Sequence, residues 1–392
     1  MESAKINNEY RSVSSRILQL KAMQHTIFEN MQFIPESTLL RFDCVPILQP
    51  TVKLEEIYYR DSTHTWVWII HDKNNKHPKC VLKIYHIPNK SKKNKTGLNY
   101  QLEVRFLRLF SYMARNHISP HVVLPIGHTI FTAADVKKIV GEKYKIPNSQ
   151  DSPQTPQQMS QFMVLLSECA TSSFYTDLIQ NTLSPYNVKV LIFQVVYTIM
   201  VIQDVFSSFR HNDLHLSNVL TQEFSAPPEG VDLYEWTDID RVYIDLKRAP
   251  RRALLWDMHF SSVSKEDAAI FNLQDDYIVP ADWVHTRHCK NNYYDMHKFF
   301  DSLEYVLSFK NKTEFITERA LIDTIVPTHL KCLSTNRTKD EKKQMRLWEQ
   351  CIIQPIEILR LPYFKELYQI PKKYTLIKKY CPIARLNHTE TK

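Results

Sequence analysis

Apolar and polar residues alternate with a period of two in the first part of the chain, which predicts β-strands at 51–60, 65–72 and 80–85. A helical period follows over 98–116 and predicts a helix. A continuous apolar run at 162–167 predicts another strand. We therefore expect this part of the chain to be rich in strands and to contain a helix.

The pattern changes at about residue 184, beyond which helical spacing dominates. The most apolar run, 191–202, is about twelve residues long and is bracketed by Lys189 and Asp204. Because a membrane helix needs about 20 apolar residues, we expect a buried core helix here and no membrane span. The chain is therefore predicted to be α+β, with a small β-rich lobe followed by a larger helical lobe.

Composition shifts divide the chain further. Residues 144–160 are rich in Pro, Gln and Ser, which predicts a flexible insertion. We place a helical N-terminal extension at 1–46, a small lobe at 47–166 and a large lobe at 167–392. A second insertion, with an additional pair of strands, is expected at 223–252.

The overall composition is that of a globular protein. The 392 residues are 43% hydrophobic and 23% charged. The net charge is +8, but the lysines are scattered, and we interpret the cluster at 90–95 as a solvated loop, so nucleic acid is not an expected partner. The seven cysteines show no paired spacing, and no signal peptide is recognisable. A reducing intracellular compartment is therefore expected.

The segment 209–220 carries the clearest chemical signal. It places Asp213 and Asn218 five positions apart, between an apolar helix and an apolar strand. Phosphoryl transfer requires such a pair on one short loop, since the Asp orients and deprotonates the attacking hydroxyl while the Asn holds a magnesium ion. The pattern His-x-Asp-Leu-x-x-x-Asn resembles the catalytic loop of the protein-kinase superfamily. The alternative is an Asx-rich turn after a buried helix.

A second pair of candidates lies earlier in the chain. Lys83 lies on the third predicted strand among apolar neighbours, where an inward-facing ammonium needs anionic partners such as ATP phosphates and a carboxylate. Glu103, the acidic residue of the predicted helix at 98–116, borders the apolar face of that helix and could reach Lys83. The alternatives are a lysine that faces solvent on an edge strand and an acid on the helix surface.

Two aspartates compete as a second metal ligand downstream of the loop. Asp257 follows the hydrophobic run 253–256 directly and is itself followed by Met, so it is preferred. Asp245, at the end of another predicted strand, is the alternative. Asp295 begins a further apolar helix, either as a buried acceptor for N–H groups of the catalytic loop or as a simple helix-start acid.

Together these motifs resemble the protein kinases of large nucleocytoplasmic DNA viruses, the iridovirus- and poxvirus-like groups. The resemblance covers roughly residues 51–310. It is carried by the phrases Phe-Arg-His-Asn-Asp-Leu-His-Leu-Ser-Asn-Val-Leu, Pro-His-Val-Val-Leu-Pro-Ile and Tyr-Asp-Met-His-Lys-Phe-Phe. It implies a bilobal kinase fold, protein substrates phosphorylated on Ser or Thr, ATP and Mg2+ as cofactors, and a location in the host cytoplasm or the virion.

The resemblance also implies roles for individual residues. Asp213 would be the base, and Asn218 and Asp257 the metal ligands. The residues expected to contact the nucleotide directly or through a partner are Lys83, its partner Glu103, and Ser167 and Glu168 at the boundary of the two predicted lobes.

The chain departs from the kinase pattern at several positions. No Gly-x-Gly-x-x-Gly motif is present among its four glycines, and the turn at 60–65, where it would lie, contains no glycine. Asn212 stands where Arg is usual, and His215 stands where a Lys that contacts the γ-phosphate is common. No Ala-Pro-Glu motif follows, although 278–281 is a distant substitute. The alternatives are therefore a pseudokinase that serves as a virion scaffold or binding module, and a small-molecule phosphotransferase.

Overall fold

The computed structural model describes the following residues: 16–17, 40–41, 52–60, 65–73, 78–87, 100–141, 161–227, 229–237, 240–263, 293–311, 313–326, 328, 331 and 353–382. The predicted insertion at 144–160, the glycine-free turn at 61–64 and the segment 278–281 lie outside the described residues, as does most of the predicted extension at 1–46. The chain divides into two compact units, which are described separately. The smaller comprises Val13–Ser111 and Val123–Cys169, and the larger comprises Met1–Ser12, Tyr112–Val122 and Ala170–Lys392.

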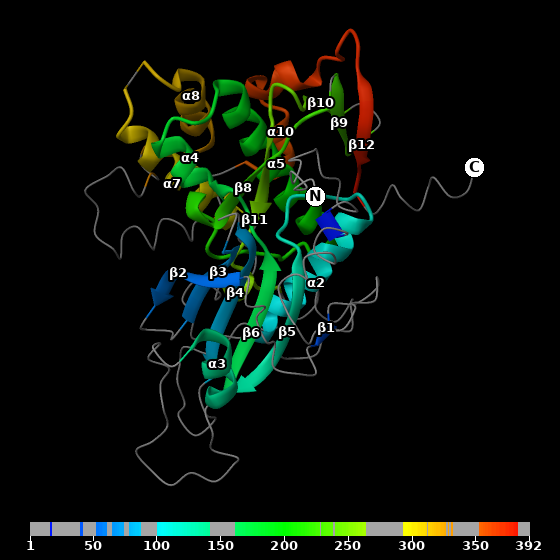
Figure 1. The fold of residues 1–392 in the computed structure, drawn as a ribbon. Coiled ribbons are helices and arrows are strands. Elements are labelled where there is room, and N and C mark those ends of the chain that lie inside the picture. Colours follow the sequence, from blue (N-terminus) through cyan, green and yellow to red (C-terminus); the bar gives the residue numbers. More distant parts are fainter. Residues whose placement is uncertain are drawn as a thin grey trace. The chain divides into compact units, whose positions relative to one another are not determined.

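The smaller unit is built on a six-stranded sheet with the order β1-β5-β6-β4-β3-β2 (Figure 1). Its β1–β5 pair is parallel, and the other neighbouring strands are antiparallel. The strands are β1 Leu40–Arg41, β2 Val52–Arg60, β3 Thr65–Asp72, β4 Pro78–Ile87, β5 Pro125–Thr132 and β6 Gln161–Glu168.

Two helices accompany these strands in the sequence. Helix α2, Tyr100–Arg115, lies where the helical period predicts it, and the strands at 52–60, 65–72 and 78–87 confirm the predicted alternation. Helix α3, Ala133–Val140, was not expected. The sequence does indicate where this helix starts, since Thr132 and Asp135 form a capping box in which each side chain accepts the backbone N–H of the other residue.

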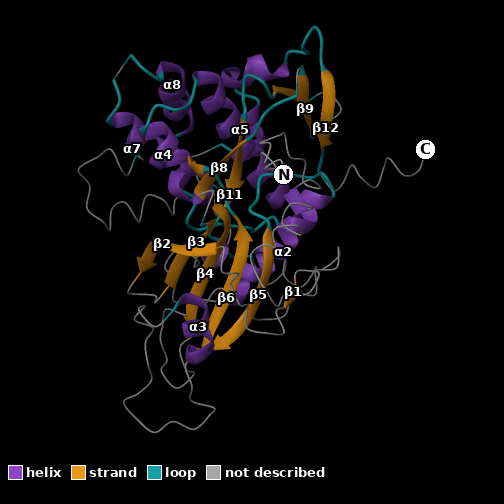
Figure 2. Ribbon diagram, in the orientation of Figure 1, coloured by secondary structure: helices purple, strands orange, loops and turns teal. Residues whose placement is uncertain are grey.

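Among its described residues, the larger unit contains helices and two three-stranded sheets, with the orders β11-β8-β7 and β10-β9-β12 (Figures 1 and 2). The helices are α4 Phe174–Ile179, α5 Pro185–Val205, α7 Tyr294–Ser308, α8 Ile316–Ile325 and α10 Pro355–Leu359, with 3-10 turns η3 Leu216–Asn218, η4 Met258–Phe260 and η7 Pro362–Tyr368. The strands are β7 Ser172–Ser173, β8 Val219–Glu223, β9 Gly230–Glu235, β10 Arg241–Asp245, β11 Arg251–Leu255 and β12 Thr375–Tyr380. The predicted α+β class, with a β-rich lobe and a more helical lobe, is confirmed, although the larger unit holds more strands than the helical pattern indicated.

Helix α5 forms the centre of the larger unit. It begins at Ser184, whose hydroxyl accepts the N–H of Asn187 at 3.2 Å, and Pro185 occupies its first turn. At 21 residues it is longer than the predicted apolar run, and by length and composition it could cross a membrane. However, 72% of its most apolar stretch is buried inside the unit, as the prediction of a core helix requires.

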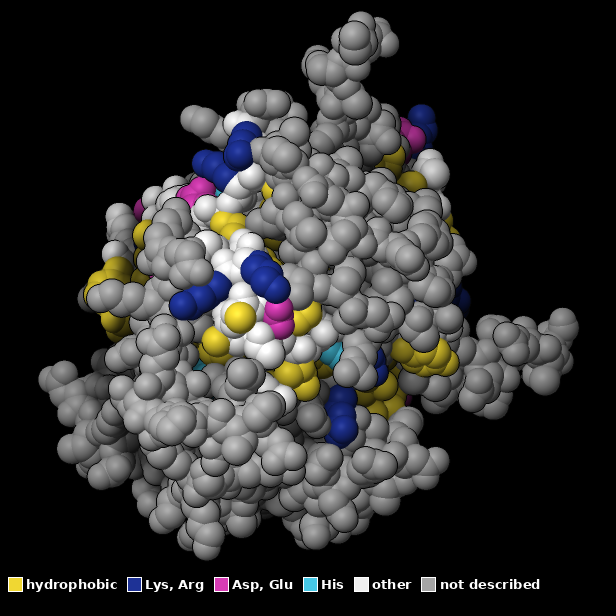
Figure 3. All heavy atoms as spheres, turned by 60° about the horizontal axis from the view of Figure 1, so that its bottom comes forward, with side chains coloured by type: hydrophobic (Ala, Val, Ile, Leu, Met, Phe, Trp, Pro, Cys, Tyr) yellow, Lys and Arg dark blue, Asp and Glu magenta, His cyan; other side chains and the backbone are white. Residues whose placement is uncertain are grey.

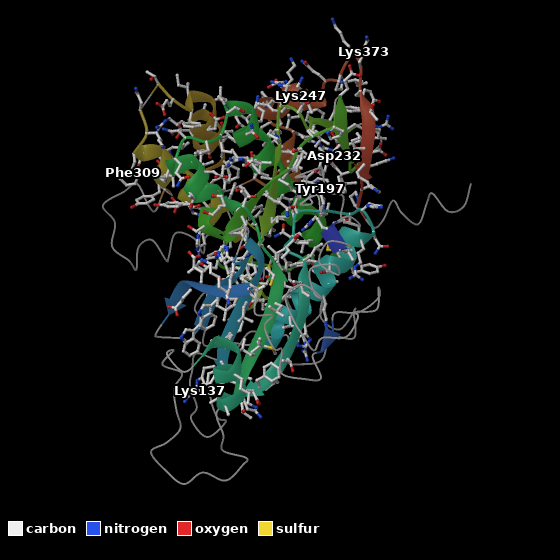
Figure 4. The ribbon with its side chains drawn as sticks, viewed as in Figure 1. Lys137, Tyr197, Asp232, Lys247, Phe309 and Lys373 are labelled. Carbon is white, nitrogen blue, oxygen red and sulfur yellow. The ribbon has the colours of Figure 1, made fainter. Side chains whose placement is uncertain are left out.

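An aromatic cluster joins the region predicted as an insertion to this core. The ring of Tyr234, on β9, lies 5.0 Å from that of Tyr197 on α5 and 4.9 Å from that of Tyr380 on β12. The Tyr234 hydroxyl lies 2.8 Å from Nε2 of His121. Figure 4 places Tyr197 and Asp232, the β9 residue two positions before Tyr234, inside this unit and Lys373 at its periphery. The C-terminal strand is thus held by side-chain packing as well as by its parallel pairing with β9.

This packing predicts a sharp difference between two tyrosines of the C-terminal segment. Tyr380 is 0% exposed and Tyr374 is 41% exposed. Replacing Tyr380 by Ala leaves a cavity and should lower the free energy of unfolding of the larger unit by about 3–5 kcal/mol. Tyr374→Ala should cost no more than about 1 kcal/mol. Urea unfolding, together with hydrogen exchange of the β9 amides, measures both, and equal losses would contradict the packing role of Tyr380.

Candidate active site

The predicted catalytic loop lies between α5 and β8 in the larger unit, and its two signature residues are bonded to each other. Nδ2 of Asn218 donates to the carbonyl oxygen of Asp213 at 2.9 Å and to its carboxylate oxygen Oδ2 at 3.3 Å. The structure therefore brings Asp213 and Asn218 together, as the spacing predicts. Because the amide nitrogen of Asn218 is engaged, its amide oxygen is the atom that could bind a cation.

The backbone of this loop is anchored by a buried carboxylate. Asp295, in the first turn of α7, is fully buried and accepts the N–H groups of His211 at 2.6 Å and Asn212 at 2.9 Å. Burial raises the pKa of Asp295, and the neighbouring His211 ring and the two N–H donors lower it only in part. Asn212 has a left-handed backbone (φ 62°), a conformation that Asn tolerates better than most residues. The role of Asp295 as an acceptor for the loop is confirmed.

Two basic side chains flank the Asp213 carboxylate. Nζ of Lys298, from α7, contacts Oδ1, and Nε2 of His215 lies 3.7 Å from Oδ2. Partial burial raises the pKa of Asp213, but His215 and Lys298 outweigh this effect and hold the pKa well below its usual range. Asp213 is consequently an ionised carboxylate at neutral pH. Lys298 has no counterpart in the sequence prediction, because its contact with Asp213 spans 85 positions of the chain.

Asp257 lies beside the loop because strand β11 pairs with β8. In that antiparallel pair Leu255, the last residue of β11, is opposite Val219, the first residue of β8. The end of β11 therefore lies next to the end of the loop. The N–H of Trp256 donates to the carbonyl oxygen of Asn218 at 3.1 Å, and the buried ring of His211 bonds the Trp256 carbonyl at 2.8 Å. Both bonds are made by the backbone of Trp256, and the next residue along the chain is Asp257.

Asp245 lies elsewhere, at the end of β10 in the sheet formed by β9, β10 and β12. Its Oδ1 accepts the N–H groups of Lys247 at 2.9 Å and Arg248 at 3.2 Å, so it caps a turn. Of the two candidate aspartates, Asp257 is therefore the one whose neighbour in the chain, Trp256, is bonded to the predicted catalytic loop.

Lys83 and Glu103 form an ion pair within the smaller unit. Nζ of Lys83 lies 3.1 Å and 3.3 Å from the two carboxylate oxygens of Glu103, and the side chains are 4% and 0% exposed. The ammonium also lies 4.9 Å from the centre of the Tyr85 ring. The solvent-facing alternatives for both residues are therefore wrong. The structure brings together the lysine of β4 and the acid of α2.

Ser167 and Glu168, at the end of β6, are both buried. Oε1 of Glu168 accepts the N–H of Leu124 at 2.7 Å, and the Glu168 carboxylate also contacts the guanidinium of Arg16. The Glu168 side chain is thus occupied by these protein groups. Arg16, 152 positions away along the chain, gave no signal in the sequence.

The candidate metal ligands are oxygen donors, which suit a hard cation such as Mg2+. Among the described residues, no group of three or more His, Cys, Asp or Glu could hold a metal ion. An ion bound by Asn218 and Asp257 would therefore need ligands from a bound nucleotide or water, which is the usual coordination of Mg2+ in phosphoryl-transfer sites.

The described part of the face displayed in Figure 3 shows no large field of one charge. On the face displayed in Figure 3, Lys and Arg side chains lie among hydrophobic and acidic ones. The net charge of +8 is thus not gathered into one basic patch on the described part of that face.

Comparison with known proteins gives one informative similarity. The chain is 31% identical over 222 residues to a protein of Acanthamoeba polyphaga mimivirus named "putative serine/threonine-protein kinase". The chain is thus similar to a viral kinase-like protein. The aligned region covers 52% of this chain and 45% of the relative, so the chain spans less than half the length of that relative. No family model matches the chain.

The buried pair in the smaller unit predicts strong energetic coupling. Glu103→Leu leaves the Lys83 ammonium without its carboxylate, and Lys83→Met leaves a buried acid without its cation, so each should lower the free energy of unfolding by about 3–5 kcal/mol. The double variant, Lys83→Met with Glu103→Leu, should be within about 1 kcal/mol of the wild type, because it removes both charges. Urea unfolding of the four proteins forms a double-mutant cycle, and additive losses would show that the pair is not coupled.

Proposed function

We propose that the protein is a serine/threonine protein kinase that transfers the γ-phosphoryl group of ATP to hydroxyl groups of protein substrates. The observation that carries the proposal is the hydrogen-bonded Asp213–Asn218 pair on one anchored loop. The backbone bond from Trp256, next to Asp257, to Asn218 supports it, as does the similarity to the viral relative. The proposal includes kinship with the kinases of large DNA viruses, of which the iridovirus- and poxvirus-like groups are the narrower suggestion.

In the proposed reaction the substrate hydroxyl oxygen forms a bond to the γ-phosphorus, and the bond from that phosphorus to the β,γ-bridging oxygen breaks. ADP leaves with the electron pair, and the hydroxyl proton passes to the Asp213 carboxylate. A carboxylate of low pKa is a weak base. Asp213 would therefore orient the hydroxyl first and accept its proton late, once bonding to phosphorus has made the hydroxyl acidic.

Asn218 and Asp257 would hold Mg2+, which supplies charge neutralisation for the phosphate oxygens when it is bound. We assign Lys83 to the ATP phosphates, with Glu103 fixing the position of the ammonium through the buried ion pair. Ser167 and Glu168 are assigned to the nucleotide region. The Glu168 carboxylate is engaged by Leu124 and Arg16, and the Glu168 N–H donates to the Leu124 carbonyl oxygen at 2.9 Å, so contact there would use other backbone groups of this segment.

The loop also suggests how activity would be controlled. Nδ2 of Asn212 donates to the carbonyl oxygen of Phe260 at 2.8 Å and to Oγ of Ser262 at 2.9 Å, and the backbones of Arg210 and Ser262 exchange two hydrogen bonds. These neutral contacts hold the start of the segment that follows Asp257. We therefore expect no phosphate-reading role at position 212.

The first test is the loss of the base. Asp213→Asn keeps the shape of the side chain but removes the proton acceptor, so phosphate transfer should fall by about 10²–10⁴-fold while the fold is retained. Purified wild type and variant are incubated with labelled Mg·ATP and a mixed protein substrate, and the label on protein is counted. Circular dichroism checks the fold. Full turnover by the variant would reject Asp213 as the base, and absence of both transfer and ATP binding in the wild type would favour a pseudokinase scaffold.

A matched pair of variants tests the second metal ligand. Asp257→Asn should reduce transfer by roughly 100-fold and raise the Mg2+ concentration needed for half-maximal activity, because it weakens a charged ligand. Asp245→Asn should leave both quantities unchanged, since Asp245 caps a turn in another sheet. Magnesium titrations of the two variants measure the difference. The opposite result would assign the ligand to Asp245.

A further inference from the structure

One face of helix α7 holds three consecutive residues of the catalytic loop. Lys298 follows Asp295 by three positions, so the two side chains project from the same face of the helix. Asp295 accepts the N–H groups of His211 and Asn212. Nζ of Lys298 lies 3.3 Å from the Asn212 carbonyl oxygen and contacts the Asp213 carboxylate. The helix thus offers an acceptor and a donor to the same short stretch of loop.

The ion pair between Lys298 and Asp213 is open to ligands. The Lys298 side chain is 16% exposed and that of Asp213 is 25% exposed. An ammonium carries three N–H donors. Within the described part of the chain two of them are directed at Asn212 and Asp213, which leaves one for a bound group.

The loop itself carries His215 at the position where the resemblance expects a lysine. Nδ1 of His215 accepts the N–H of Ser217 at 3.3 Å, so this nitrogen caps the turn η3. Nε2 lies 3.7 Å from Asp213, farther away than the contact made by Lys298. Among the residues that the structure describes, the nearest cationic group to the Asp213 carboxylate therefore comes from α7.

We propose that Lys298 is a catalytic residue, whose ammonium bridges the Asp213 carboxylate and the γ-phosphoryl group during transfer. This rests on the proposed kinase function. Negative charge on the phosphoryl oxygens lies close to the negative carboxylate when the hydroxyl attacks, and a fixed cation between them offsets this repulsion. Lys298 neither gains nor loses a proton, since the hydroxyl proton passes to Asp213.

The proposal is tested by removing the positive charge of Lys298, by keeping it as an arginine, and by placing a lysine at position 215 instead. We measure kcat and the KM for ATP in Lys298→Met, in Lys298→Arg and in the double variant Lys298→Met with His215→Lys. Lys298→Met should lose about 100-fold in kcat with little change in thermal stability. Lys298→Arg, which keeps the charge, should retain at least about a tenth of the wild-type kcat. The double variant should recover at least about tenfold over Lys298→Met, because it returns a lysine to the loop.

The matched control is Lys310→Met, since Lys310 follows α7 and bonds the carbonyl oxygen of Ile179 and the side chain of Asn181. Its kcat should stay within about twofold of the wild type. A kcat of Lys298→Met close to that of the control would overturn the proposal. The proposal would also be overturned if kcat fell in Lys298→Met and was restored neither in Lys298→Arg nor in the double variant with His215→Lys. That result would mean that Lys298 has a structural role.

The same measurements distinguish a failure of the proposed kinase function from a failure of the role of Lys298 alone. A wild type without transfer that depends on Asp213 would overturn the kinase assignment and the role of Lys298 with it. An active wild type whose Lys298 variants behave like Lys310→Met would overturn the role of Lys298 alone.

Discussion

The candidate site of the larger unit depends on one buried carboxylate. Burying a charge is costly unless donors surround it, and Asp295 obtains its donors from the backbone N–H groups of His211 and Asn212. Those N–H groups belong to a turn in which Asn212 has a left-handed backbone. Asp295 stabilises this turn, and the turn supplies the donors that the buried carboxylate of Asp295 needs. The fixed turn then directs Asp213 outward, where it remains partly exposed among buried neighbours.

The same turn is also bonded to the residue that follows strand β11. His211, held by Asp295 through its backbone, uses its ring to bond the carbonyl oxygen of Trp256, and Asn218 accepts the N–H of Trp256. Burial lowers the pKa of His211, which favours the neutral ring. A neutral imidazole can bond one carbonyl without bringing another charge into the interior. Asp257 is therefore placed by a chain of hydrogen bonds that begins at Asp295.

The parts of this arrangement that the sequence predicts are the local ones. Asp213 and Asn218 are five positions apart on one loop, so their spacing brings them together. Strand alternation and the apolar run at 162–167 together identified four of the six strands in the sheet of the smaller unit. The sequence favours Asp257 over Asp245 as a metal ligand but does not show which strand pairs with β8, the pairing on which the placement of Asp257 depends. The contact of Lys298 with Asp213 could not be predicted, since it requires the position of α7 against the loop rather than any motif.

Two lysine–acid pairs in the chain differ in a way that bears on what each can do. The Lys83–Glu103 pair is almost fully buried, and because desolvation offsets much of its attraction, such a pair is weak evidence for stability. What the pair does provide is an ammonium held in a fixed position by two contacts with one carboxylate. The Lys298–Asp213 pair is partly exposed, so its charges remain able to meet a ligand. A partly exposed cation of this kind is what the role proposed for Lys298 requires, since a cation that stabilises developing charge must reach the group on which that charge forms.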